Sequence, residues 1–110
     1  MAEGVKHDSG KPMPRLLPPS ALLAIARVLT FGAKKYSPDN WKYVRGAKDR
    51  YLDAMLRHIL AYNSGEVNDP ESGEPHLAHA GCCLLFLLDA AETGLVFPEE
   101  SQPSPTQNTL

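Results

Sequence analysis

An acidic stretch that runs directly into two histidines is the part of this chain best equipped for chemistry. Glycine, proline, asparagine and serine separate its acidic residues, which predicts a loop. Pro75 suits the first position of a helix, so the two histidines behind it lie one turn apart on one face. Carboxylates and imidazoles can hold a divalent cation, whereas the alternative is a solvated loop before a helix whose histidines bond to carbonyl groups. The side chains concerned are Glu66, Asp69, Glu71, Glu74, His76 and His79.

A cation beside basic side chains is an arrangement that binds polyphosphates. Mg²⁺ or Mn²⁺ bridges phosphate oxygens, stabilises the charge of the transition state and lowers the pKa of a bound water. Basic side chains then hold the remaining oxygens. The sequence has no glycine-rich phosphate loop of the Walker or dinucleotide type, so the cation and the basic residues must bind the phosphates. This pattern favours hydrolysis of a small phosphorylated molecule, and the basic residues available are Lys11, Arg15, Lys34, Lys35 and Arg57.

Composition places the chain among single-domain globular proteins. Its 110 residues suffice for one core, and 43% of them are hydrophobic. The net charge of −2 gives no general electrostatic reason to bind nucleic acid or a membrane surface. No apolar run approaches the roughly 20 residues of a membrane span, and the polar N-terminus is unlike a secretory signal. Cys82 and Cys83 are adjacent and cannot easily pair, which predicts reduced thiols in a cytoplasmic protein.

The first part of the chain predicts an arm and one helix. Residues 1–19 contain four prolines and two glycines among basic residues, so we expect an extended basic arm. Leu16 and Leu17 are expected to dock this arm on a core. Ser20 predicts an N-cap, and the apolar helix that follows is expected to end near Gly32.

Two further helices are expected after a turn. The turn covers Tyr36–Trp41, where serine, proline, aspartate and asparagine are concentrated. Residues Ala47–Asn63 carry apolar side chains at helical spacing and predict the second helix. The third helix is predicted from Pro75 or His76 to Thr93, with Gly94 as its C-terminal stop.

These elements predict an all-α fold, a small bundle of three or four helices whose short fourth helix lies around Val96 or in the arm. The helical domain would cover residues 20–97, and the polar, proline-rich residues 98–110 would be a disordered tail. The first and third helices are apolar around most of their circumference, more than one chain of this size can cover. We therefore expect homo-oligomerisation, as a dimer or tetramer, to complete the bundle.

Four runs of the sequence resemble one family. LLPPSAL, LTFGAKKYSPDNW, RYLDAMLRH and GEVNDPESGEPHLAHAGCCLLFLL are similar to the small phage and bacterial dATP/dGTP diphosphohydrolases. That group includes the MazZ proteins and is related to the all-α MazG pyrophosphatases. The resemblance implies a helical oligomer that uses Mg²⁺ or Mn²⁺ to cut dGTP or dATP to the monophosphate and pyrophosphate. In a phage, acting in the host cytoplasm, the dGMP so formed can supply the synthesis of modified purines.

The resemblance also implies roles for individual residues. Glu66 or Glu71 would be the general base for attack of water on the α-phosphorus. Lys34 and Lys35 would contact the nucleotide, or alternatively they would compensate the dipole of the helix that ends beside them. Trp41 would stack on a base, or alternatively it would anchor the turn to the core. The implied metal ligands are Glu66, Asp69, Glu71, His76 and His79, and the implied nucleotide contacts are Lys34, Lys35, Tyr36, Asn40, Trp41, Arg57 and His58.

Three other functions fit parts of the sequence. A phosphohydrolase of the His-Asp type needs a dipeptide that occurs here only as His7-Asp8, in the arm. A helical interaction module, whose acidic loop binds nothing, is a non-enzymatic alternative. A structural zinc site is another, and its ligands would be His76, His79 and Cys82 or Cys83.

Overall fold

The computed structural model describes residues 2–99 and confirms the all-α fold class. Within those residues there is no strand, only an isolated antiparallel bridge between Asn68 and Pro75. None of the helices in this part of the chain combines the length and hydropathy that a bilayer span requires. The elements in chain order are η1 (Pro14–Leu16), α1 (Pro19–Lys35), η2 (Asn40–Tyr43), α2 (Ala47–Asn63) and α3 (His76–Thr93).

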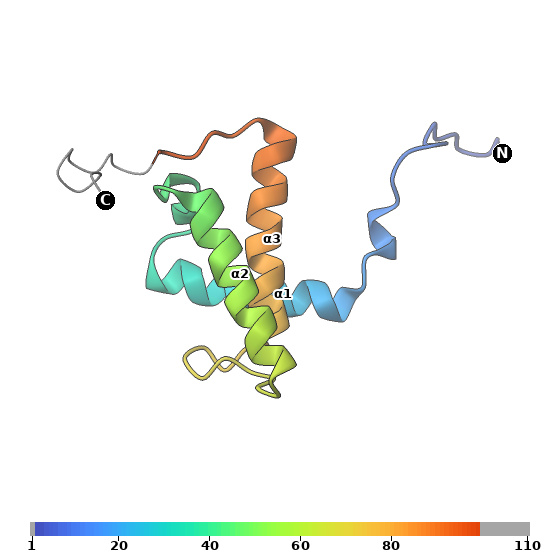
Figure 1. Ribbon diagram of the computed structural model, residues 1–110. Coiled ribbons are helices and arrows are strands. Elements are labelled where there is room, and N and C mark those ends of the chain that lie inside the picture. The colour runs from blue at the N-terminus through green and yellow to red at the C-terminus, as the bar shows by residue number, and fades with distance from the viewer. Residues whose placement is uncertain (1, 100–110) are drawn as a thin grey trace.

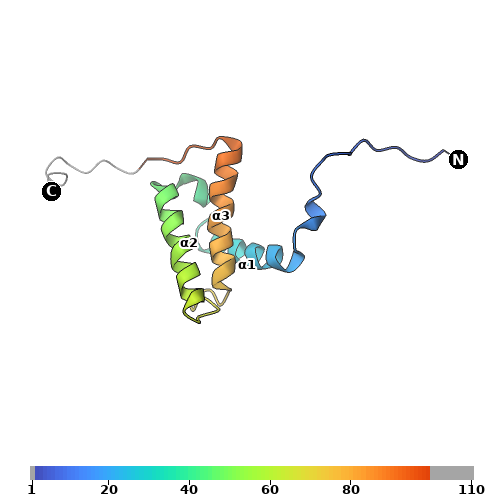
Figure 2. The same cartoon turned by 45° about the vertical axis from the view of Figure 1, so that its right-hand side comes forward.

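Helices α2 and α3 form an antiparallel pair, and α1 crosses the N-terminal half of α3 at a steep angle (Figures 1 and 2). Small side chains on α3 permit this close crossing. A Cβ added at Gly81 would lie 2.9 Å from the Cδ1 atom of Ile25 on α1. Next to this point Val28 packs with Ala78 and Cys82 to form the buried cluster between the two helices. The crossing sets the distance between α1 and the loop that precedes α3.

The bounds of α2 and α3 agree with the sequence prediction, while α1 differs at both ends. It begins at Pro19, with Pro18 as N-cap, so the prediction that Ser20 is the cap was wrong. Proline supplies the backbone φ of a first turn without needing its missing N–H, and this favours the earlier start. The helix also continues through Gly32, because one glycine costs only about 1 kcal/mol and good helix formers follow it. Its last turn closes with a 2.8 Å bond from the Tyr36 N–H to the Gly32 carbonyl.

The arm extends away from the helices instead of packing on them (Figure 1). Leu16 and Leu17 remain 65% and 52% exposed, so the prediction that they dock on the core of this chain was wrong. The physical reason is the course of α1, which carries the arm to the side of α3 away from α2. The helix expected around Val96 is absent from the described residues, and η1 is one short turn within the arm. From residue 100 onward the predicted tail lies outside the described residues.

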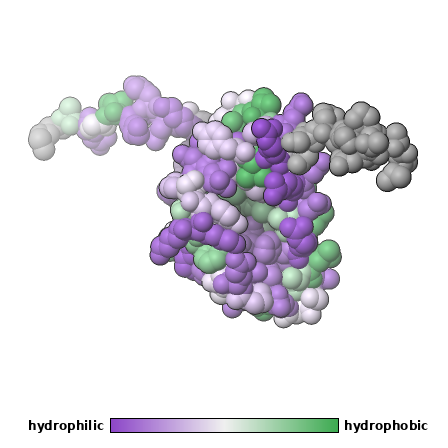
Figure 3. Space-filling view, turned by 90° about the vertical axis from the view of Figure 1, so that its left-hand side faces the viewer, coloured by the Kyte–Doolittle hydropathy of each residue, from purple (hydrophilic) through white to green (hydrophobic). Residues whose placement is uncertain are grey.

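Much apolar surface stays uncovered within the described chain. Val28 is the largest side chain among the buried hydrophobic residues. On the face shown in Figure 3, hydrophilic side chains predominate and apolar ones form separate small patches. Homo-oligomerisation would cover the exposed leucines and isoleucine, and it stays a prediction. These side chains are Leu22, Leu23 and Leu29 on α1, Leu56, Ile59 and Leu60 on α2, and Leu77, Leu84, Leu85 and Leu88 on α3.

Candidate functional site

An open cleft of about 1020 Å³ lies between the C-terminal half of α1, the segment that follows it, α2 and the start of α3. Lys34, Glu66 and His76 are absent from its lining. Lys11, Arg15 and Glu74, which the sequence also suggested, are absent from the lining as well, and the remaining metal and nucleotide candidates do line it. They are Lys35, Tyr36, Asn40, Trp41, Arg57, His58, Asp69, Glu71 and His79.

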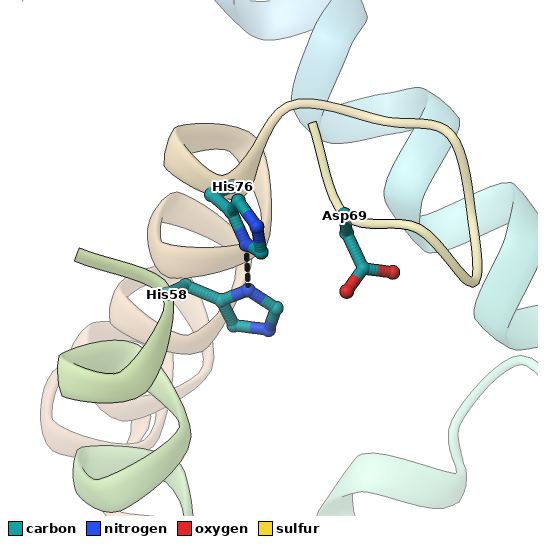
Figure 4. Close-up of side chains that lie close together, drawn as sticks. All are labelled: His58, Asp69 and His76. Atoms are coloured by element: carbon teal, nitrogen blue, oxygen red, sulfur yellow. Dashed lines mark hydrogen bonds between the residues drawn. The ribbon is translucent and has the colours of Figure 1, made fainter. Parts of the chain in front are cut away.

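Two of the predicted metal ligands lie behind the wall of the cleft, in a chain of short hydrogen bonds. The Nε2 atom of His76 is 2.6 Å from the Oε1 atom of Glu66. Its Nδ1 atom is 2.8 Å from the Nδ1 atom of His58 (Figure 4). His76 is only 4% exposed and does not line the cleft, whereas His58 does. Both nitrogens of the buried ring are therefore occupied by other side chains.

The loop that carries Asp69 is held by its own hydrogen bonds. The Ser72 N–H donates to the Oδ2 atom of Asp69 at 2.9 Å, and the Gly73 N–H donates to the Asp69 carbonyl at 2.8 Å. The Ser72 hydroxyl lies 2.6 Å from the Nε2 atom of His79. His79 is also 3.8 Å from the carboxylate of Asp69. A turn centred on Asp69 thus fixes this carboxylate beside His79 at the cleft.

Two ion pairs connect the same loop to α1. The guanidinium of Arg27 contacts both carboxylate oxygens of Glu74, and the Nζ atom of Lys35 lies 2.6 Å from Glu71. The hydrogen bond to Glu71 raises the pKa of Lys35. Glu74 thus acts as the partner of an arginine, and neither of these two residues lines the cleft, whereas the paired Glu71 and Lys35 both line it.

The ligand atoms of His58, Asp69 and His76 all lie within 4.8 Å of one another, a grouping that could hold a cation, but both nitrogens of His76 already have side-chain partners. His58 was expected to contact the nucleotide, not a metal. The sequence did not indicate a metal-binding role for His58, because His58 and His76 come together only through the packing of α2 against α3.

Arg50 and Asp53 also line the cleft, one helical turn apart on α2. Their spacing with Arg57, on the same face of α2, could have identified them.

The ionisation states of these groups suit cation binding. Burial lowers the pKa of His58, and the neighbouring His79 and His76 lower it further. Burial also lowers the pKa of His79, against the opposing effect of Asp69. For Asp69, burial alone would raise the pKa, but the bonds from Ser72 and the charge of His79 outweigh it and the pKa is lowered. Near neutral pH the cleft therefore presents neutral imidazoles beside an ionised carboxylate, the forms that bind metals.

Trp41 is anchored in an aromatic cluster at the cleft wall. Its ring stacks on Phe86 with 4.5 Å between centroids and a 5° interplanar angle, and Phe97 meets it edge-on. The Tyr51 hydroxyl donates to the Trp41 carbonyl at 2.9 Å. Burial raises the pKa of Tyr51 to about 12, so this donor keeps its proton. The anchoring role of Trp41 is confirmed, and stacking on a base stays a prediction.

Residues 1–97 match a family model described as "dATP/dGTP diphosphohydrolase, N-terminal". The chain belongs to this family. A protein of Salmonella phage PMBT28 named dATP/dGTP diphosphohydrolase is 40% identical over 86 residues, which cover 77% of this chain. The chain spans 29% of the length of that phage relative. No solved structure matches. The resemblance found in the sequence is thus confirmed at the level of the family.

Membership of the dATP/dGTP diphosphohydrolase family leaves little support for the zinc and His-Asp alternatives. Burial raises the pKa of Cys82 to about 12 and also raises that of Cys83, as expected for two buried thiols among apolar side chains. Among residues 2–99 neither cysteine joins a group of metal-ligating atoms. His7 and Asp8 are exposed in the arm and are likewise outside that group.

Proposed function

We propose that this member of the family hydrolyses a deoxypurine triphosphate, dGTP or dATP, to the monophosphate and pyrophosphate with the help of Mg²⁺ or Mn²⁺. One observation carries the proposal: the same cleft is lined by the imidazoles and carboxylate of a candidate cation site and by basic side chains. His58, Asp69 and His79 form the first group, and Lys35 and Arg57 belong to the second. The family description and the name of the phage relative support the choice of substrate.

The donor atoms at the cleft fit a divalent cation. Asp69 and Glu71 offer carboxylate oxygens, and His58 and His79 offer imidazole nitrogens. Mg²⁺ prefers oxygen ligands, whereas Mn²⁺ also accepts imidazole, so this mixed set favours Mn²⁺. When bound, such a cation neutralises phosphate oxygens and lowers the pKa of a water molecule.

Lys35 would bind the triphosphate, and Glu71 would accept a proton. Lys35 pairs with Glu71 at 2.6 Å, and the phosphate oxygens of a substrate would take the place of that carboxylate. Glu71 is then free to accept a proton from the water that attacks the α-phosphorus. A bond forms between the water oxygen and that phosphorus, and the bond to the bridging oxygen breaks and releases pyrophosphate. Glu66, the other base suggested by the sequence, is not part of the cleft lining.

The purine would lie against the segment that follows α1. Tyr36, Asn40 and Trp41 line the cleft there, and aromatic faces with an amide side chain are suited to stacking on a base and bonding to its edge. Because the relative from Salmonella phage PMBT28 is named for the same activity, supply of dGMP for modified-purine synthesis in a phage is the biological role we favour.

We further propose that the protein acts as a homo-oligomer, a dimer or tetramer. The support is the surface described above, with exposed apolar side chains on all three helices and no large side chain fully buried in the described chain. Sedimentation of the purified protein at micromolar concentration tests it. A single species at the mass of one chain would remove this part of the proposal.

Product analysis tests the activity. The protein would be incubated with each dNTP and NTP in Mn²⁺, in Mg²⁺ or in chelator, and the products separated by ion-exchange chromatography. Monophosphate with pyrophosphate, strongest for dGTP or dATP and absent in chelator, is the expected result. An Asp69→Asn variant is expected to lose this turnover, while Glu92→Gln, an exposed change at the end of α3, is the matched control. Nucleoside plus triphosphate, or no turnover of any nucleotide by the wild type, would contradict the proposal.

A further inference from the structure

Three side chains form a continuous path from the outside of the loop to the cleft. Glu66 is half exposed at the start of the loop, His76 is buried at the start of α3, and His58 lines the cleft from α2. The two contacts between them, of 2.6 and 2.8 Å, are within hydrogen-bond distance, and the first is short. We call these residues the Glu66–His76–His58 chain.

The positions of the protons along this chain follow from the contacts. The ionised carboxylate of Glu66 can only accept, so the Nε2 atom of His76 carries a hydrogen. In a neutral ring the Nδ1 atom of His76 then has a lone pair and accepts. The Nδ1 atom of His58 must therefore be the donor. That leaves the Nε2 atom of His58 without a hydrogen.

The free nitrogen of His58 lies on the cleft side. In Figure 4 the Nδ1 atom of this ring meets His76, while its second nitrogen points away from His76. His58 and Asp69 both line the open cleft. A lone pair on the Nε2 atom is thus offered to whatever occupies that space.

We propose that Glu66 and His76 are positioning residues that hold His58 in its Nδ1–H tautomer, so that its Nε2 lone pair binds a cation in the cleft beside Asp69. This inference deepens the proposed function and rests on it for the cation, but not for the tautomer. Glu66 and His76, which the sequence suggested as metal ligands, are therefore assigned the role of positioning a ligand. Such outer partners orient a ligand imidazole and increase its basicity.

The surrounding structure favours one fixed arrangement of the Glu66–His76–His58 chain. The backbone N–H of His76 donates to the Val67 carbonyl at 2.9 Å, and the backbone N–H of Glu66 donates to the Ala61 carbonyl at 3.0 Å. The His58 ring lies flat against His79, with 4.6 Å between centroids and a 10° interplanar angle, which restricts its rotation.

The tautomer can be measured directly by ¹⁵N–¹H correlation spectra of the imidazole rings, on metal-free protein at pH 8. The expected wild-type pattern is Nδ1–H for His58 and Nε2–H for His76. In water a neutral histidine side chain favours the Nε2–H form, so the expected His58 signal differs from that of His7, which is exposed in the arm. An Nε2–H form of His58, or a doubly protonated His76, would overturn the proposal.

Two variants extend the test. Glu66→Ala removes the acceptor from an exposed position and is expected to shift His58 toward the Nε2–H form; Glu92→Ala, an exposed carboxylate on α3, is expected to leave it unchanged. Calorimetric titration with Mn²⁺ alone is expected to give 10- to 100-fold weaker binding for Glu66→Ala. It should give no measurable binding for His58→Ala. An unchanged His58 tautomer and unchanged Mn²⁺ affinity in Glu66→Ala would overturn the proposal.

These measurements separate the inference from the proposed function. The spectra need neither nucleotide nor metal, so a protein without turnover can still have the predicted tautomer. Conversely, an active enzyme whose His58 carries its hydrogen on the Nε2 atom would keep the proposed function and lose this inference.

Discussion

The guanidinium of Arg27 contacts both carboxylate oxygens of Glu74, with its Nε atom at 2.9 and 2.8 Å from them. Arg27 lies on α1, and Glu74 is the last loop residue but one before α3. The contact therefore connects the crossing helix to the loop whose Asp69 carboxylate reaches the cleft. It holds the loop that carries the proposed cation ligand Asp69, although neither Arg27 nor Glu74 lines the cleft.

Loss of this contact is expected to loosen the loop without unfolding the helices. Arg27→Lys keeps the charge but loses the two-oxygen geometry, because lysine acts as a point charge. Since Arg27 is more than half exposed, the free energy of unfolding should fall by only about 0.5–1 kcal/mol. Hydrogen exchange in residues 66–75 should accelerate, while α2 stays protected. Lys48→Ala, an exposed change on α2, is the control. Equal rates of hydrogen exchange in residues 66–75 of the Arg27→Lys and Lys48→Ala variants would count against a positioning role for Arg27.

The two neighbouring lysines at the end of α1 are expected to differ in function. Lys35 lines the cleft and pairs with Glu71, whereas Lys34 does not line it. Lys35→Ala should raise KM for the triphosphate by about tenfold, as expected for loss of one charge-assisted contact of about 1.4 kcal/mol. Lys34→Ala should change KM much less. Steady-state kinetics on the two variants decides this, and a larger effect at Lys34 would mean that the orientation of the lysines in the active protein is reversed.

The metal-free protein should lose stability as the pH falls from 7 toward 5. Burial lowers the pKa values of His58 and His79 in the folded state below the ordinary value of 6.5. The unfolded chain therefore binds protons at a pH where the folded chain does not. The folded state has its full stability above pH 6.5 and loses it as the pH drops through that value toward the lowered pKa values. Asp69, whose pKa is lowered from 3.8, acts in the same direction at more acidic pH.

Urea denaturation in chelator, at pH values from 8.5 to 5, measures this effect. The midpoint should be constant above pH 7.5 and fall below it. His7→Ala should reproduce the wild-type curve, because His7 is exposed in the arm. His58→Gln should flatten it. A midpoint that rises toward pH 5 would contradict the expected sign.

The crossing of α1 over α3 leaves room for no more than a hydrogen at Gly81. Alanine there gains helix propensity of about 1 kcal/mol, yet its Cβ would lie 2.9 Å from the end of the Ile25 side chain. Because that end can rotate, Gly81→Ala should change the free energy of unfolding by less than 1 kcal/mol. Gly81→Val should destabilise by about 1–3 kcal/mol through overpacking. Thermal denaturation of both variants tests this, and equal melting temperatures would show that the helices separate at little cost.

Local signals in the sequence predicted the bounds of α2 and α3 well. The proline before His76, and Gly94 with its left-handed φ of 74°, act within one turn of the helix end and need no knowledge of the rest of the fold. The start of α1 was missed because both Pro19 and Ser20 are good first-turn residues. The failed docking of the arm depended on the direction of α1, and no local pattern encodes that direction.

The candidate site could be predicted in part. The acidic loop and the histidines do meet at one end of the α2–α3 pair, but the division of Glu66, Asp69 and Glu71 among different roles could not be inferred from spacing. In a loop, side-chain direction depends on distant contacts such as that of Arg27 with Glu74. The contact of His58 with His76 depends on the register between two helices. Helical periodicity defines faces but not that register.

The parallel stacking of Trp41 on Phe86 gives the cleft an optical reporter of its own. Trp41 is the single tryptophan of the sequence, and it stands at the wall that the purine would meet. Its emission therefore comes from one place in the molecule. Filling of the cleft can be followed in the unmodified chain by intrinsic fluorescence, without a dye and without turnover.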